Sequence, residues 1–184
     1  GGAVDGGGNG LMMASAVASR SVVQAYIGVG GNLGDPIRSI RWAHDTLVAR
    51  SDMREVLCSP LYRSAPVDAA GPDFVNAVFA ISTLLGCMDL LSLLQKMEQE
   101  AGRVRSYQNA PRPLDLDLLL FGDQWIEEPG LTVPHPRLHE RLFVLTPLAQ
   151  IAGGTLVPRR GRTVAELLGD QQSKQHFNPI RGEK

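Results

Sequence analysis

The chain has 184 residues, of which 43% are hydrophobic and 20% are charged, and its formal net charge is -1. This length suits a single domain, and the near-zero net charge excludes binding of duplex nucleic acid through bulk electrostatics. No apolar run approaches the length of a membrane span, so we expect a cytoplasmic protein that binds neither nucleic acid nor membrane.

The chain begins with a glycine-rich polar segment that leads to Met12 and Met13. Such a composition cannot bury apolar surface, so residues 1–22 are predicted to be a disordered leader, at least partly of cloning origin. Residues 23–184 are predicted to form one domain, and we expect it to be a monomer.

Strand and helix signals then follow each other along the first half of the domain. Residues 24–29 (QAYIGV) have the pattern of a buried strand, and residues 30–34 are predicted to be a turn. Asp35 as N-cap and Pro36 at the first helical position predict a helix over residues 36–50.

Two more strands and a second helix are predicted next. Residues 54–59 have strand character, and residues 74–84 (FVNAVFAISTL) alternate strongly, as a long strand would. Asp89 begins a helical pattern that ends near Gly102.

The remaining segments are shorter and are interrupted by proline. Residues 103–113 are expected to be irregular, residues 115–121 (DLDLLLF) to form a strand, and residues 125–126 to continue as a short hairpin. Three prolines break up the following segment, and residues 163–168 suggest a short final helix. The order strand, helix, strand, strand, helix, strand is typical of an α+β ferredoxin-like fold, with an antiparallel sheet and helices on one face.

Two aspartates on the predicted strand 115–121 form the sharpest chemical signal. Side chains alternate along a strand, so Asp115 and Asp117 face the same side, roughly 6.6 Å apart at the backbone. Two close carboxylates repel each other unless a cation lies between them, and Mg²⁺ prefers such oxygen ligands. The alternative is a pair of solvent-facing acids on an edge strand.

Arginines close to this pair favour the metal interpretation. Arg103, Arg105 and Arg112 precede the strand within the irregular segment. Guanidinium groups bind phosphoryl oxygens in a bidentate manner, so acids beside arginines indicate a site for a metal and a polyphosphate.

Five further polar or aromatic residues are candidates for ligand contacts, and four of them also have a plainer structural interpretation. Gln95 and Glu98 share one face of the predicted second helix, which equally suits solvated surface residues. Phe74 and Asn76 share one face of a strand and suit a flat heterocycle, but a core Phe beside a satisfied Asn has the same pattern. His135 lies between two prolines with no second His or Cys nearby, which favours a phosphate contact over a metal.

Several common catalytic devices are absent from the sequence. It contains no P-loop and no nucleophile elbow, and nothing marks Ser64 as an activated nucleophile. The two distant cysteines, Cys58 and Cys87, form neither a metal-ligand cluster nor a disulfide framework, and we expect reduced core thiols.

Together these motifs resemble the 6-hydroxymethyl-7,8-dihydropterin pyrophosphokinase family, from about residue 25 to residue 148. The landmarks occur in order as residues 26–35 (YIGVGGNLGD), 62–64 (YRS), 73–77 (DFVNA), 95–98 (QKME), 102–105 (GRVR), 111–117 (PRPLDLD) and 133–136 (VPHP), followed by Arg141 and Phe143. The resemblance implies transfer of diphosphate from ATP to the pterin hydroxymethyl group in folate biosynthesis, with release of AMP.

The resemblance also implies a role for each site residue. Asp115 and Asp117 would bind two Mg²⁺ ions that bridge the triphosphate of ATP. The residues expected to contact ATP are Gln95, Glu98, Arg103, Arg112, His135 and Arg141, with Arg103 and Arg112 also acting in catalysis. The residues expected to contact the pterin are Phe74 and Phe143, which sandwich its ring, Asn76, and the backbone near Ser64 and Val67.

Some positions depart from the family pattern. Residues 106–110 (SYQNA) lack the tryptophan that normally folds over the site, and Gly31 and Ser64 stand where serine and threonine are common. These departures leave open how the mobile loops around the site close.

The resemblance further implies in-line attack by the substrate's own hydroxyl on the β-phosphorus of ATP. Catalysis then reduces to alignment and charge neutralisation, with Asp117 or a metal-bound hydroxide as candidates for the proton acceptor. We expect ATP to bind before the pterin. Two alternatives are a non-catalytic binding module on the same sheet and a nucleotidyltransferase, which would release diphosphate instead of AMP.

Overall fold

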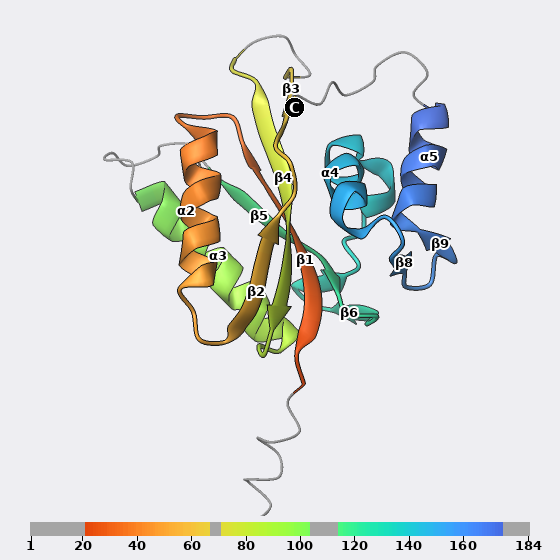
Figure 1. Cartoon of the computed structure of the whole chain (residues 1–184), viewed down its shortest axis with the longest axis horizontal. Helices are drawn as coiled ribbons and strands as arrows, with labels where there is room; N and C mark the ends of the chain where they lie inside the picture. Colours follow the sequence, from red (N-terminus) through yellow and green to blue (C-terminus); the bar gives the residue numbers. More distant parts are fainter. Residues whose placement is uncertain (1–20, 67–70, 104–113, 175–184) are drawn as a thin grey trace, which may run out of the picture.

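The computed structural model describes residues 21–66, 71–103 and 114–174. An antiparallel sheet of five strands forms its centre, in the order β2-β4-β1-β5, with β3 paired to one end of β4 (Figure 1). The strands are β1 (Val23–Gly31), β2 (Met53–Cys58), β3 (Tyr62–Ser64), β4 (Phe74–Thr83) and β5 (Asp115–Phe121). The predicted α+β class and antiparallel sheet are confirmed, whereas the predicted leader lies almost entirely outside the described residues.

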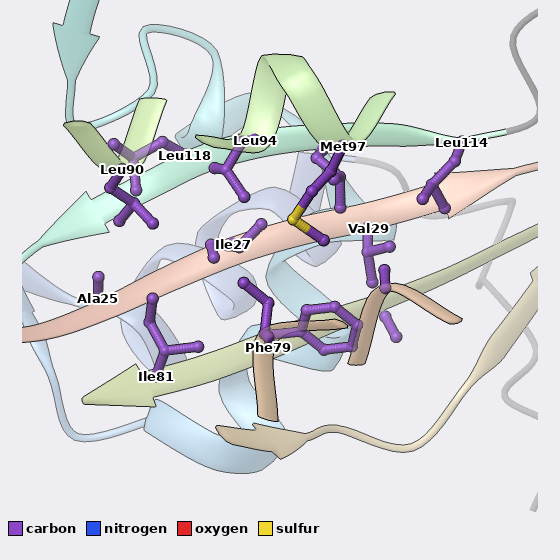
Figure 2. Packing of buried hydrophobic residues seen from close by; sticks show 14 of the residues in the cluster. Ala25, Ile27, Val29, Phe79, Ile81, Leu90, Leu94, Met97, Leu114 and Leu118 are labelled. Carbon is purple, nitrogen blue, oxygen red and sulfur yellow. The ribbon is translucent and has the colours of Figure 1, made fainter. Parts of the chain in front are cut away.

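Two helices cover one face of the sheet. They are α2 (Pro36–Val48), where the Asp35 carboxylate accepts a hydrogen bond of 3.1 Å from the Arg38 N–H as an N-cap, and α3 (Cys87–Arg103). Leu90, Leu94 and Met97 of α3 point onto the buried side chains of β1 and β4 (Figure 2). This face is the main hydrophobic core, and the helical periodicity in the sequence predicted both of its helices.

The two helices of the predicted order thus share one face, as expected. Two additional helices lie on the other side: α4 (Leu142–Ala152) packs against the sheet, and α5 (Val164–Lys174) packs against α4 (Figure 1). Helix α4 was not predicted, because Pro147 lies inside it and proline usually ends a helix. The helix persists because its apolar side chains form a second core with the sheet. The members of this core include Val78, Leu119, Leu120, Leu138, Val144, Leu145, Leu148, Val164 and Leu167.

Short elements connect the layers. A hairpin of β6 (Ile126–Glu128) and β7 (Leu131–Val133) confirms and extends the one predicted near residue 125. The 3-10 turn η1 (Leu138–Glu140) leads into α4, and β8 (Leu156–Val157) pairs with β9 (Arg162–Thr163) before α5. Among helices of the described ranges, none has the length and apolar character needed to cross a bilayer.

Two local predictions need correction. Gly30 and Gly31 belong to β1 and not to a turn, because both pair with residues of β4. The cysteines are free thiols but not core residues, since Cys58 is exposed and Cys87 is half-buried. Burial raises the pKa of both thiols, that of Cys87 to about 11 with a further contribution from Glu128, so both are predominantly protonated near neutral pH.

Candidate active site

The register of the sheet places the predicted site residues of three strands on one face. Gly30 at the end of β1 pairs with Asn76 of β4 on one side and with Asp115 of β5 on the other. Residues directly opposite each other in a sheet project to the same face, and so do residues two apart along a strand. Asn76, Asp115 and Asp117 therefore share the face that also carries α4.

The two aspartates have the arrangement that the alternation predicted. Asp115 is exposed and Asp117 is half-buried, while Leu116 between them is buried in the main core. No hydrogen bond or ion pair to the Asp117 carboxylate is present among the described residues. A half-buried carboxylate without a cationic partner, beside a second acid, fits a divalent cation with hard oxygen ligands.

This pair is small for a metal site made by protein alone. Within the described ranges, three or more His, Cys, Asp or Glu side chains do not gather at any point where they could hold a metal. Mg²⁺ tolerates few protein ligands and takes the others from water and phosphate oxygens. The donor set therefore suits Mg²⁺ carried with a nucleotide better than a structural zinc or calcium ion.

Glu98 of α3 holds the backbone of the strand that carries this pair. Its Oε1 accepts a hydrogen bond of 2.7 Å from the Leu116 N–H. Since β5 is an edge strand, this N–H has no partner strand to bond to. Glu98 thus fixes the strand between Asp115 and Asp117, a role that its helical position alone did not reveal.

His135 lies within electrostatic range of both Asp117 and Arg141. The His135 N–H bonds to the Leu119 carbonyl at 2.9 Å, which ties the residue to β5. Burial lowers the pKa of His135, Asp117 opposes this shift, and the cations Arg141 and Arg137 add to it. The Nδ1 atom accepts a hydrogen bond of 3.1 Å from the Arg137 N–H, so the neutral ring carries its proton on Nε2 and is a donor there.

An aromatic and amide surface lies on the same sheet face, next to β3. Ser64 pairs with Phe74 across β3 and β4, and both are half-buried, as is Asn76. Phe143, in the first turn of α4, is 39% exposed, and the Arg141 guanidinium lies 5.7 Å from its ring centroid. An exposed Phe beside a well-packed core is suited to stacking against a ligand.

Other predicted site residues are less well defined by the structure. Gln95 is exposed on α3, three residues before Glu98. Val67 and Arg112 lie outside the described residues, as does Arg105, and for Arg103 only the backbone at the end of α3 is described. The structure thus brings together the aspartates, Glu98, His135, Arg141 and the aromatic surface, and leaves the role of the arginine-rich segment as a prediction.

Gly30 was part of a landmark segment but was not predicted to be a site residue. Gly30 is buried, has no side chain, and lies between Asn76 and Asp115 in the sheet. Adjacent strands are roughly 4.8 Å apart, which puts the backbones of these two residues about 10 Å from each other.

Comparisons with known proteins show which family the chain is similar to. The model of the 7,8-dihydro-6-hydroxymethylpterin-pyrophosphokinase (HPPK) family matches residues 26–153. The 2-amino-4-hydroxy-6-hydroxymethyldihydropteridine pyrophosphokinase of Pseudomonas aeruginosa is 45% identical over 148 residues, which cover 80% of this chain and 91% of the relative. The protein of the same name from Synechocystis is 38% identical over 144 residues, with 78% and 74% covered.

Solved structures with the same fold are more distant in sequence. The crystal structure of Plasmodium falciparum HPPK-DHPS with pteroate matches with a TM-score of 0.66 at 12% identity, over 86% of this chain and 44% of that chain. The structure of the HPPK-DHPS in complex with substrates matches with a TM-score of 0.68, over 88% and 46%. The chain spans less than half of these longer proteins, and at this identity the likeness shows the fold alone.

Proposed function

The chain belongs to the 7,8-dihydro-6-hydroxymethylpterin pyrophosphokinase family. From this premise we propose how the sheet face that carries Asn76, Asp115 and Asp117 binds the two substrates of this enzyme. The enzyme transfers diphosphate from ATP to the hydroxymethyl group of 6-hydroxymethyl-7,8-dihydropterin, a step of folate biosynthesis. In our proposal the pterin lies over Phe74 and Asn76, and the triphosphate lies over Asp115 and Asp117. The observation that supports it is the register in which Gly30 separates Asn76 from Asp115.

On the nucleotide side, Asp115 and Asp117 would hold two Mg²⁺ ions, which neutralise the charge of the triphosphate when bound. The carboxylate of Asp117, without an ion-pair partner in the described part of the chain, supports this assignment. His135 would donate a hydrogen bond from its Nε2–H group to a phosphoryl oxygen, and Arg141 would add a positive charge nearby. Gln95, Glu98, Arg103 and Arg112 are the other proposed ATP contacts, with Arg103 and Arg112 stabilising charge in the transition state.

On the pterin side, Phe74 and Phe143 would sandwich the ring, and Asn76 and the backbone near Ser64 and Val67 would read its polar edge. The exposed ring of Phe143 supports stacking, because an apolar side chain exposed at a site is available for a ligand. The half-buried carboxamide of Asn76 offers both a donor and an acceptor, which suits the paired hydrogen-bonding groups of a pterin.

The chemistry then requires alignment more than covalent participation. The hydroxymethyl oxygen attacks the β-phosphorus of ATP and loses its proton to a base, for which Asp117 is a candidate. The bond from that phosphorus to the α–β bridging oxygen breaks, and AMP leaves with the bridging oxygen. Holding both substrates in line can lower the barrier by about 7–11 kcal/mol. We further propose that the enzyme works as a monomer in the cytoplasm, where ATP is supplied.

The direct experiment is to incubate the protein with ATP, MgCl₂ and the pterin and to separate the products by chromatography. We expect AMP and pterin diphosphate in equal amounts. Release of diphosphate would indicate a nucleotidyltransferase instead, and no product with bound ligands would indicate a binding module without catalytic activity. The Asp117→Asn protein, which keeps the shape of the side chain but not its charge, is the matched control.

A further inference from the structure

The side chain of Asn76 lies directly over Gly30 on the neighbouring strand. A Cβ atom built on Gly30 would overlap Asn76 Oδ1 and would lie 3.1 Å from both Asn76 Cγ and the Val75 carbonyl oxygen. The carboxamide therefore occupies the space that any side chain at position 30 would fill. Gly30 has no positive φ that would require glycine, so this close approach is what distinguishes it from other strand residues.

No hydrogen bond from the described residues holds the Asn76 carboxamide in this place. Within the described part of the chain, its amide group has no hydrogen-bond partner, although the residue is half-buried. Its orientation therefore depends on packing, and the bare backbone at Gly30 is the surface on which it rests. A group kept free of internal bonds at a half-buried position is available to bond to a ligand.

We propose that Gly30 is a positioning residue for pterin recognition, which acts by letting the Asn76 carboxamide lie flat over β1 with its polar atoms free for the substrate. The inference rests on the proposed function, in which Asn76 reads the pterin. Gly30 itself would contribute no polar group to the ligand. A methyl group at this position would displace the carboxamide and weaken pterin binding through Asn76.

The geometry also predicts which half of the site a substitution at position 30 would disturb. Gly30 pairs with Asp115 on its other side, yet the three atoms nearest to an added Cβ all belong to Asn76 and Val75 of β4. A substitution at position 30 should therefore disturb the pterin half of the site and leave the nucleotide half unchanged. A general loss of structure would not make this distinction.

The test is a double-mutant cycle with Gly30→Ala, Asn76→Ala and the double variant. Calorimetry measures the Kd of the pterin in the presence of Mg²⁺ and a non-hydrolysable ATP analogue, and separately the Kd of the analogue alone. We expect Gly30→Ala and Asn76→Ala each to raise the pterin Kd roughly tenfold, the effect of losing a substrate hydrogen bond. The double variant should bind no more weakly than Asn76→Ala, and all three should bind the analogue like the unmodified protein.

Gly153→Ala is the control for packing strain away from the site. Its added Cβ would lie 2.9 Å from the Ala149 carbonyl oxygen at the end of α4, so it should lower the melting temperature without changing the pterin Kd. An unchanged pterin Kd in Gly30→Ala, or losses that add up in the double variant, would overturn the inference. Failure of the proposed function looks different, since the unmodified protein would then neither bind the pterin nor release AMP.

Discussion

Asp117 combines two properties that seldom occur together on a strand, because it is half-buried and lacks an ion-pair partner within the described ranges. In the proposed function its carboxylate binds Mg²⁺ and does not contribute to the stability of the fold. We predict that Asp117→Ala lowers the rate of AMP release at least a hundredfold, because electrostatic stabilisation of the transferring group is lost. The free energy of unfolding should change by less than about 0.5 kcal/mol, as for a surface substitution.

Product chromatography and urea denaturation together check this prediction. Asp123→Ala is the matched control, since Asp123 is an exposed acid in the turn that follows the same strand. Turnover close to normal in Asp117→Ala would count heavily against the site, whereas loss of activity together with unfolding would assign Asp117 a structural role.

At this scale the sequence predicted some site residues and missed others for a physical reason. Asp115 and Asp117 were predicted to share a face, since the period of two along a strand is fixed by the backbone. The place of Gly30 opposite both Asn76 and Asp115 was not predicted, because it depends on the registers of two strand pairings. The bond from Leu116 to Glu98 was missed for a similar reason, since it joins residues 18 apart that meet only after packing.

At the scale of elements, the edge strand β5 depends on α3 for the position of its acidic pair. We predict that Glu98→Ala weakens Mg²⁺-dependent ATP binding, because the Leu116 N–H loses its acceptor and the strand between the two aspartates is freed. Glu98→Gln keeps an oxygen at the same place and should retain more of the binding than Glu98→Ala. Calorimetric titration of both variants with the ATP analogue checks the order.

Equal losses in the two variants would show that the charge of Glu98, and not its bond to β5, is what matters. Hydrogen exchange at Leu116 separates the two contributions directly. The amide should exchange faster in Glu98→Ala than in Glu98→Gln, because only the first variant removes the acceptor.

Helix α4 shows where local sequence signals lose to packing. Pro147 lacks the N–H that would bond within the helix, yet the neighbours Leu145 and Leu148 are fully buried against the second face of the sheet. Strand β3 was also missed, since three residues between Pro60 and Pro66 carry too little pattern to predict a strand. By contrast, α2, α3 and β5 follow long regular patterns and were predicted within two residues of their ends.

The second core can be tested through a single side chain. Leu148 is fully buried in α4, and we predict that Leu148→Ala lowers the free energy of unfolding by about 2–5 kcal/mol. Leu156→Ala removes the same atoms from a side chain that is 65% exposed and should cost far less. Urea denaturation of both variants gives the comparison, and equal small losses would mean that α4 is not part of the cooperative core.

At the scale of the whole molecule, the two cores leave one functional surface between them. Helices α2 and α3 cover one face of the sheet, and α4 and α5 lie on the other side (Figure 1). Asn76, Gly30 and Asp115 belong to neither apolar cluster. The sequence predicted the sheet but only one of its two helical layers. Because α4 was not predicted, the sequence did not show that the proposed site and α4 lie on the same face of the sheet.

Because ligands bind to this rim only in the folded state, they should stabilise the whole domain in a metal-dependent way. At a concentration of 100 times its Kd, a ligand adds about 2.7 kcal/mol to the free energy of unfolding. For a protein of this size, this corresponds to a rise in melting temperature of roughly 5–10 °C. We predict such a rise with the ATP analogue and MgCl₂, and a much smaller one when EDTA replaces the metal, since the triphosphate would then face Asp115 and Asp117 without cations between them.

Calorimetric scans of the unmodified protein and of Asp117→Asn check this prediction and its assignment to the acidic pair. The variant should lose most of the metal-dependent rise, and without ligand it should melt no lower than the unmodified protein, because removing one of two neighbouring negative charges relieves repulsion. An equal rise with EDTA, or an undiminished rise in Asp117→Asn, would mean that the nucleotide binds elsewhere on the molecule. If instead the metal-dependent rise in melting temperature is lost in Asp117→Asn, the nucleotide binds through the carboxylates of Asp115 and Asp117. These two side chains share one face of β5 because side chains alternate along a strand.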